Sequence, residues 1–440
     1  MPPEQAGSVL HLSACDDFGG SGRAAYRLHR SLRQAGWTSR MLVARRVTTD
    51  PDVARIWRSQ AWRILDRACG EVTDWLSWQY LFYPSSYLLP FHPWLRQADL
   101  VQLYNLHGGY FSLPALLALD RPLVWRLSDM WPLTGHCTFS YDCQRWMTGC
   151  GHCPILSDDP GLRRDTTAML WRMKRHVYSR CRNLTVVSPS RWLAGRVQDS
   201  PLLQHCPVVV IPPGVDVDVF HPMPKAAARQ QLGLPTQGRL VLFSARSLGE
   251  RRKGSDWLKP TMARLWQQAE MADVRLLTVG GDVPDWMQSD RVSSLGFVSD
   301  DARLAAAYAA ADVLVLPTLA DNLPNALIES LACGTPCVAF DAGGCSEVVK
   351  YPETGYLAKP ADADDLLRGL QLLLADQPLR EAMGQRGRRL AAAEHASDLQ
   401  AQRYADLYWR LIPRDSRPDA TPDRATRVQR MIAEEARCAA

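Results

Sequence analysis

No run of about 18 consecutive apolar residues, the minimum for a helix that crosses a bilayer, occurs in this sequence. Its first residues also lack the charged head and apolar core of a secretory signal peptide. We therefore expect a cytoplasmic protein. In a reducing compartment its 12 cysteines would be free thiols or metal ligands, so they do not predict a disulfide framework.

Motifs of nucleic-acid binding are absent as well, since the chain has no helix-turn-helix, zinc-finger or RNA-binding signature. Its formal charge of +5 is unevenly distributed. Residues 1–215 carry 24 Lys and Arg against 16 Asp and Glu, residues 216–440 carry 27 against 30, and 11 of the 15 Trp lie in the first half. A basic, Trp-rich half favours an anionic surface, such as a phospholipid leaflet or a phosphorylated acceptor, over nucleic acid.

The length of 440 residues predicts two domains of about 200 residues each. Both halves repeat an apolar strand pattern, a Gly-rich or polar loop and a helical pattern, which predicts an α/β fold with parallel sheets. The rigid turn Pro212-Pro213-Gly214-Val215-Asp216 is typical of a linker. We therefore expect one domain at residues 1–215 and another at residues 216–400. A helix that crosses back to the first domain and a polar tail are expected within residues 401–440.

Residues 311–340, ADVLVLPTLADNLPNALIESLACGTPCVAF, form the central motif of the second half. Strands are predicted at residues 313–316 and 337–340, where apolar residues run without interruption. Pro324 suits the first turn of a helix between them. A strand that leads into a helix N-terminus is where an open α/β sheet binds anions, so this turn is the predicted floor of the active site.

The ends of that predicted helix also carry recognisable residues. Asp321 or Asn322 is expected to cap its N-terminus, and Gly334 suits its C-terminal end. Glu329 lies one to two turns inside the helix, at a distance that suits a hydroxyl group of the ligand rather than its phosphate.

Two further loops are candidates for contact with the same ligand. Phe18-Gly19-Gly20-Ser21-Gly22 separates a predicted strand at residues 9–13 from a predicted helix at residues 23–34, so its glycines would let the backbone approach a ligand. A plain tight turn is the alternative for this loop. Residues 246–254 hold Arg246, Arg251, Arg252 and Lys253 after a predicted strand. They would clamp a diphosphate from the opposite side, unless the loop is merely solvated.

Polar residues also follow two predicted strands of the first half, at residues 100–104 and 123–127. They are Asn105 and His107 after the first strand, and Ser128 and Asp129 after the second. Parallel sheets keep their chemistry at these carboxyl ends of the strands.

A Cys-rich loop at residues 131–154 contains four thiols, those of Cys137, Cys143, Cys150 and Cys153. Four thiols with a C-x2-C pair predict a tetrahedral structural zinc site, in which His136 or His152 would replace one ligand. Unligated thiols and a redox or disulfide role are the alternatives. A catalytic zinc is not expected, because four protein ligands leave no open position.

Residues 55–97 combine five Trp with Arg55, Arg58, Arg63 and Arg67. Helical spacing places several of the aromatic residues on one face. An amphipathic helix pair that lies on anionic lipid would explain this pattern. A helical hairpin that faces the core is the more ordinary alternative.

Several motifs together resemble a known family. They are Asp321-Asn322-Leu323-Pro324-Asn325, Glu329-Ser330-Leu331-Ala332-Cys333-Gly334-Thr335-Pro336, Gly343-Gly344 with Glu347, Arg252-Lys253-Gly254, Ile211-Pro212-Pro213-Gly214-Val215-Asp216, Gly19-Gly20-Ser21-Gly22 and Ser188-Pro189-Ser190. In this combination the chain resembles the GT-B glycosyltransferases of retaining family 4. The similarity is to the D-N-L-P-N branch, which acts in exopolysaccharide and colanic-acid-type synthesis, and it extends to about residue 400.

This resemblance implies GT-B architecture, in which two Rossmann-like parallel-sheet domains face each other across a cleft. It implies that the donor is bound through residues of both domains, with its ribose hydroxyls on Glu329. The other donor-binding residues implied are Gly19, Gly20, Ser21, Gly22, Gly296, Phe297, Val298, Asn322, Leu323, Pro324, Asn325, Ala326 and Leu327.

The resemblance also implies catalytic roles. Asp321 stands where relatives have the first Glu of an E-x7-E element, near the donor sugar. Lys253 would neutralise the leaving phosphate together with Arg246 or Arg252. Many relatives have a His where this chain has Ser128, so Asp129 is the catalytic candidate in the first domain. His107 and His136 are the further candidates on the acceptor side.

The function implied is the transfer of a sugar, with retention, from a UDP- or GDP-sugar to a hydroxyl of a glycan or lipid-linked oligosaccharide. No cofactor is expected for catalysis, and the expected location is the cytoplasm, in peripheral contact with the inner face of the membrane. A nucleotide-sugar epimerase, a sugar phosphorylase and a non-catalytic nucleotide-sugar-binding paralogue are the alternatives.

Overall fold

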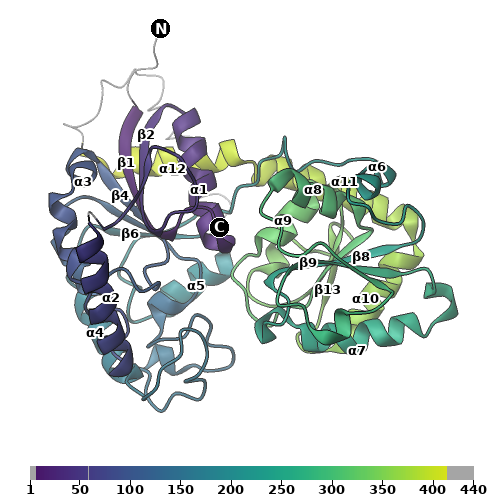
Figure 1. Cartoon of the computed structure of the whole chain (residues 1–440), viewed down its shortest axis with the longest axis horizontal. Coiled ribbons are helices and arrows are strands. Elements are labelled where there is room, and N and C mark those ends of the chain that lie inside the picture. Colours follow the sequence, from purple (N-terminus) through teal and green to yellow (C-terminus); the bar gives the residue numbers. More distant parts are fainter. Residues whose placement is uncertain (1–5, 58, 414–440) are drawn as a thin grey trace, which may run out of the picture.

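The computed structural model describes residues 6–57 and 59–413, so Arg58 and the predicted polar tail lie outside the described residues. The chain forms two sheets whose strands are all parallel, one of seven strands and one of six. Figure 1 shows them as two lobes, with the first half of the chain in one lobe and the second half, apart from its last helix, in the other. The predicted α/β fold with two Rossmann-like parallel-sheet domains is confirmed.

The sheet of the first domain has the strand order β3-β2-β1-β4-β5-β6-β7. Its central strands β4, β5 and β6 are buried along their whole length, which explains their uninterrupted apolar sequences. The strands are β1 (Ala6–Cys15), β2 (Trp37–Arg45), β3 (Val53–Arg55), β4 (Leu100–Leu103), β5 (Leu123–Arg126), β6 (Leu184–Ser188) and β7 (Val208–Val210).

The sheet of the second domain has the order β10-β9-β8-β11-β12-β13. Both β11 and β12 are buried at every residue and occupy the ranges predicted for the central motif. The strands are β8 (Leu240–Ser247), β9 (Arg275–Gly281), β10 (Val292–Ser294), β11 (Val313–Leu316), β12 (Cys337–Phe340) and β13 (Gly355–Ala358).

Helices connect the parallel strands in both domains (Figure 1). Those before residue 215 are α1 (Gly19–Gln34), α2 (Gln60–Trp75), α3 (Pro93–Gln97), α4 (Thr167–Tyr178) and α5 (Arg191–Asp199). Those after it are α6 (Lys225–Gln231), α7 (Ser255–Trp266), α8 (Asp301–Ala310), α9 (Asn325–Ala332), α10 (Ala363–Ala375), α11 (Gln377–Glu394) and α12 (Ser397–Leu411).

The predicted helix that crosses back to the first domain is α12, which follows α11 after a short break. The break between α11 and α12 is bonded to the linker, because Val215 N–H donates to the His395 carbonyl and His395 Nδ1 lies 3.1 Å from the Pro213 carbonyl oxygen. Beyond the break, Tyr404 and Tyr408 of α12 pack with Trp37 in one buried cluster of the first domain. The last helix therefore joins the two lobes (Figure 1).

The predicted helix pair at residues 55–97 was only half correct. One long helix, α2, is present, but the rest is the 3₁₀ helix η1 (Pro84–Phe91) and the five-residue α3. Pro84, Pro90 and Pro93 prevent a second long helix, because proline lacks the N–H that a helix interior requires. Apolar side chains of this segment remain exposed, namely Ile64, Leu65, Val72, Trp75, Trp78, Phe82, Tyr87 and Phe91. Among the described residues, no helix combines the length and apolar character needed to cross a membrane.

Candidate active site

Two helix N-termini, one from each domain, face each other between the lobes. Helix α1 begins within the Gly-rich loop, at Gly19, where φ is +69°. The neighbouring Gly20 carbonyl accepts a hydrogen bond of 3.3 Å from Nδ2 of Asn325, the first residue of α9. Because each N-terminus carries unpaired N–H groups and partial positive charge, the space they border favours an anion.

The other two residues of the glycine loop serve packing and a hydroxyl contact. Ser21 Oγ lies 3.0 Å from Ser128 Oγ at the end of β5. A Cβ atom on Gly22 would lie 3.3 Å from the carbonyl oxygens of Cys15 and Asp16, so a larger residue would press against β1.

The N-terminus of α9 differs from the prediction, because neither Asp321 nor Asn322 caps it. Pro324 is the N-cap residue and no side chain caps the helix. Asn322 is buried and bridges the domains instead, since it accepts from Ser190 Oγ at 2.5 Å and donates to the Leu127 carbonyl at 3.2 Å. The unpaired N–H groups of α9 are therefore left for a ligand.

Asp321 is held by the basic loop rather than by α9. Lys253 Nζ lies 2.5 Å from Asp321 Oδ2, and the Arg252 guanidinium lies 3.2 Å from the same oxygen. Burial alone would raise the pKa of Asp321, but these two cations outweigh it and lower the pKa. The carboxylate is therefore ionised and holds Arg252 and Lys253 side by side.

The sequence left open whether Arg246 or Arg252 acts together with Lys253, and the structure places these two arginines at different positions. Arg252 lies beside Lys253, with its guanidinium 5.0 Å from the centre of the Phe139 ring. Arg246 lies over the ring of Phe18, at 4.5 Å, and a Cβ atom on Gly19 would be 3.8 Å from its NH1. Arg246 therefore borders the glycine loop, whereas Arg252 borders Asp321.

Glu329 is buried within α9 and paired on both sides. Oε2 accepts from the Tyr308 hydroxyl at 3.0 Å, and Oε1 accepts from Arg27 of α1 at 2.8 Å. Arg27 also donates to Asp301 at 3.1 Å. The charge on this carboxylate is thus stabilised by a cation from the opposite domain.

Arg27 and its neighbour Arg23 are residues that the sequence did not single out. Arg23 donates to the carbonyl oxygen of Val298 at 2.9 Å, beside the exposed Phe297 and beside Gly296, whose φ is +65°. The sequence did offer one indication of their role, because Arg23 and Arg27 lie one turn apart on a predicted helix that has an apolar face. Their partners in the other domain could not be read from spacing along the chain.

The side chains of the remaining residues of the D-N-L-P-N motif and its helix pack within the second domain. Leu323 and Leu327 are buried in the core of the second domain, while Ala326 is half-buried and packs against it. Only the backbone of the two leucines is thus available to a ligand in this region.

Two glycines hold the turn that carries Asp321 and Asn322. A Cβ atom on Gly343 would lie 1.5 Å from the Asp321 carbonyl oxygen, and φ at Gly343 is +62°. Gly344 N–H donates to the Asn322 carbonyl at 2.6 Å. Only glycine permits this close approach of the two backbone segments.

In the first domain, Asp129 and His107 lie together, as their positions after neighbouring strands predict. His107 Nε2 is 3.3 Å from Asp129 Oδ2, and Asp129 Oδ1 accepts from the backbone N–H of Trp131 at 2.9 Å. His136 does not join them, because it lies in the Cys-rich loop with Nε2 3.2 Å from Cys153 Sγ.

In a comparison with known proteins, each lobe matches a protein-family model. Residues 18–219 match the family model described as "Glycosyltransferase Family 4", and residues 238–376 match the model described as "Glycosyl transferases group 1". The chain is built from two glycosyltransferase domains. The glycine loop and α9 therefore belong to different glycosyltransferase domains that meet at the candidate site.

Individual relatives match parts of the chain. A D-inositol 3-phosphate glycosyltransferase of Stackebrandtia nassauensis is 34% identical over 43% of this chain and 45% of its own length. The putative colanic acid biosynthesis glycosyl transferase WcaC of Escherichia coli is 27% identical over 62% of this chain and 66% of its own. The chain spans about half the length of the first of these relatives.

Among solved structures, HepE of Anabaena in complex with UDP-glucose superimposes with a TM-score of 0.60 and 16% identity, covering 92% of this chain and 99% of that one. At this identity the likeness shows the GT-B fold of the two glycosyltransferase domains.

The Cys-rich loop of the first glycosyltransferase domain encloses a small pocket. Cys137, Cys143, Cys150 and Cys153 all line it, together with His136. In the described part of the chain, no three His, Cys, Asp or Glu side chains already converge closely enough to hold a metal ion.

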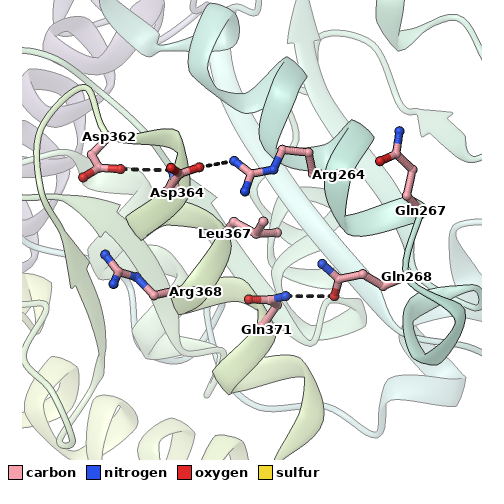
Figure 2. A pocket seen from close by; sticks show the side chains of 8 residues that line it. All are labelled: Arg264, Gln267, Gln268, Asp362, Asp364, Leu367, Arg368 and Gln371. Carbon is pink, nitrogen blue, oxygen red and sulfur yellow. Dashed lines mark hydrogen bonds and ion pairs between the residues drawn. The ribbon is translucent and has the colours of Figure 1, made fainter.

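A separate groove lies in the second glycosyltransferase domain, between α7 and α10. Figure 2 shows that its side chains bond to one another, with Arg264 paired to Asp364, and Gln371 donating to Gln268 at 2.8 Å. None of the predicted site residues lines this groove. It is therefore distinct from the candidate active site.

Proposed function

We propose that this protein transfers a sugar, with retention of anomeric configuration, from a UDP- or GDP-sugar to a hydroxyl of a glycan or lipid-linked oligosaccharide. The observation that carries the proposal is the pair of opposed helix N-termini at Gly19 and Asn325, with Arg246 beside one and Glu329 inside the other. This arrangement suits a diphosphate joined to a ribose.

The names of the relatives support the same reading. One acts on D-inositol 3-phosphate by its name, one belongs to colanic acid biosynthesis, and HepE was solved with UDP-glucose. They favour a nucleotide-sugar donor and a hydroxyl acceptor, and colanic acid favours an exopolysaccharide role.

In the proposed reaction, the acceptor oxygen attacks the anomeric carbon from the face that the diphosphate leaves. The bond from that carbon to the β-phosphate oxygen breaks, and this oxygen takes the proton of the acceptor hydroxyl. Lys253, Arg252 and the α9 N-terminus stabilise the negative charge on the departing diphosphate. Asp321 lies beside these two cations, near the position proposed for the donor sugar.

Replacement of Glu329 or Lys253 tests the assignment. We expect Glu329→Ala and Lys253→Ala each to lower sugar transfer by about 100-fold or more, because each removes a charged group from the donor site. The measurement is release of nucleoside diphosphate together with mass analysis of the glycan product.

Arg264→Ala provides the matched control, since it removes a cation from the separate groove on the second domain. Sugar transfer that is unchanged in both site variants would contradict the site. Products formed without an acceptor would indicate an epimerase, and products that require phosphate would indicate a phosphorylase. Nucleotide binding without turnover would indicate a non-catalytic binding paralogue.

We further propose that the exposed apolar surface of α2 and η1 rests on an anionic membrane that carries a lipid-linked acceptor. Ile64, Val72 and Trp75 project from α2, and the exposed Arg67 of the same helix pairs with Glu71. Figure 1 shows α2 at the outer edge of the first lobe, opposite the second domain. Apolar side chains next to cations are suited to the interface of an anionic leaflet.

Vesicle sedimentation tests this membrane contact. We expect the protein to bind vesicles that contain phosphatidylglycerol more strongly than pure phosphatidylcholine vesicles, and Ile64→Ser with Trp75→Ser to reduce binding at least tenfold. Leu117→Ser removes an exposed leucine elsewhere in the first domain and is the control. Equal binding by all three proteins would contradict the proposal.

A further inference from the structure

The Cys-rich loop has little regular structure of its own. Between β5 and α4 the only helical turns in the described residues are η3 (Trp131–Leu133) and η4 (Arg145–Met147). A loop of this length within a compact domain needs cross-links other than secondary structure.

Its four cysteines and one histidine line a single small pocket. All four thiols are free, so no disulfide supplies the cross-link.

His136 presents one ring nitrogen to this pocket. Its Nδ1 lies 3.1 Å from the Pro160 carbonyl oxygen, which can only accept, so Nδ1 carries the proton. The bare Nε2 then lies 3.2 Å from Cys153 Sγ. A ring fixed through Nδ1–H to a carbonyl, with its free nitrogen beside a thiol, is the usual orientation of a metal-binding imidazole.

The C-x2-C segment has an unusual backbone. Residues 149–152 all have positive φ, including Cys150 at 56° and His152 at 48°. Such values cost about 1–3 kcal/mol for each non-glycine residue and persist where the surroundings fix them. The backbone N–H of Gly135 donates to Cys150 Sγ at 3.2 Å, an interaction that would stabilise a thiolate at this position.

A buried lysine, Lys174, is bonded to the start of the same loop. Lys174 Nζ donates to the carbonyl oxygens of Trp131 and Thr134, at 2.6 and 3.0 Å. It therefore fixes the segment that leads into His136. A zinc ion with three thiolates carries a net charge of −1, which a lysine ammonium neighbour would balance.

We propose that the Cys-rich loop binds one structural zinc ion through three of its four thiolates, those of the C-x2-C pair Cys150 and Cys153 among them, and through Nε2 of His136. Among the described residues no three such side chains converge on one point, so the thiols would have to rotate within the pocket that they line. Three thiol protons would leave as three Zn–S bonds form. This inference is independent of the proposed sugar transfer.

The zinc would also fix one wall of the donor site. Phe139, between the first two cysteines, contacts the guanidinium of Arg252, which is paired with Asp321. Loss of the metal would thus weaken the contact between Arg252 and Phe139, while the ion pair between Lys253 and Asp321 would remain.

Elemental analysis of the full chain, purified without chelators, tests the proposal. We expect about one zinc per chain, and replacement by Co²⁺ should give thiolate-to-cobalt charge transfer with the d–d bands of a tetrahedral S₃N site. Cys150→Ser with Cys153→Ser should abolish metal binding. Cys69→Ser, which changes a half-buried cysteine on α2, should retain it.

Because the double variant is at risk of misfolding, the wild-type protein is also titrated with an organomercurial while released zinc is measured. Zinc release in step with thiol modification supports the site. Metal-free protein from zinc-supplemented medium, or disulfides between these cysteines in unreduced mass spectra, would overturn the proposal. An all-sulfur cobalt spectrum would overturn the role of His136.

Discussion

At the scale of single residues, the pairing of Arg27 with Glu329 links the two domains at the predicted ribose site. The side chains are 11% and 7% exposed and their closest atoms are 2.8 Å apart. Removal of one member of a buried ion pair leaves the other charge unpaired, at a cost of about 3 kcal/mol. The pair thus fixes the position of the Glu329 carboxylate at this site.

We expect Arg27→Met to destabilise the fold and to raise the KM for the donor more than it lowers kcat. Glu329→Gln alone should also destabilise, while the double variant should lose less stability than the two single variants combined. Denaturant unfolding of the four proteins measures the coupling free energy. Additive losses would show that the pair does not act as a unit. Arg33→Met, which affects a more exposed arginine of the same helix, is the control.

At the scale of elements, sequence patterns located those parts of the fold that burial alone determines. The residue ranges of β11 and β12 agree with prediction because uninterrupted apolar residues define them. Strands β2, β3 and β13 were missed, since none of them is an uninterrupted run of buried apolar residues.

The predicted cap of α9 failed for a different reason. Asn322 has a common capping side chain, yet its bonds to Ser190 and Leu127 in the other domain take precedence. Local propensity cannot reveal such a partner, because the two residues are distant in sequence. The candidate site was accordingly predictable as a set of strand-end loops, but its cross-domain bonds were not.

The turn before α9 depends on Gly343, which permits a close approach of two backbone segments. Gly343→Ala would place a Cβ atom within 1.5 Å of the Asp321 carbonyl and strain a φ of +62°. We expect a loss of stability of at least about 2 kcal/mol and weakened donor binding, because the turn must shift. Denaturant unfolding and nucleotide titration measure both effects.

Gly195→Ala is the matched control for this change. Gly195 lies within α5 and a Cβ atom there would meet nothing within 4 Å. Alanine should stabilise that helix by about 0.5–1 kcal/mol. If both glycine variants behaved alike, the tight contact at Gly343 would not govern the turn.

At the scale of the whole molecule, both domains contribute to the candidate site and several bonds cross between them. Glu347 of the second domain accepts from the backbone N–H groups of Arg191 and Trp192 at the start of α5, at 3.0 and 2.9 Å. Asn322, Arg27 and α12 add further connections. A donor held between the glycine loop and α9 would add one more connection between the lobes.

A ligand that binds only the folded state raises stability by about 2.7 kcal/mol at 100 times its dissociation constant. We therefore expect UDP or GDP, and the corresponding sugar nucleotides, to raise the midpoint of thermal unfolding, whereas ADP serves as a comparison for the base. Glu329→Ala should remove most of this shift by deleting the ribose contact, while Arg264→Ala should retain it. If no nucleotide changed the midpoint of thermal unfolding, the result would contradict donor binding between the domains. A shift that survives Glu329→Ala would place the ribose elsewhere.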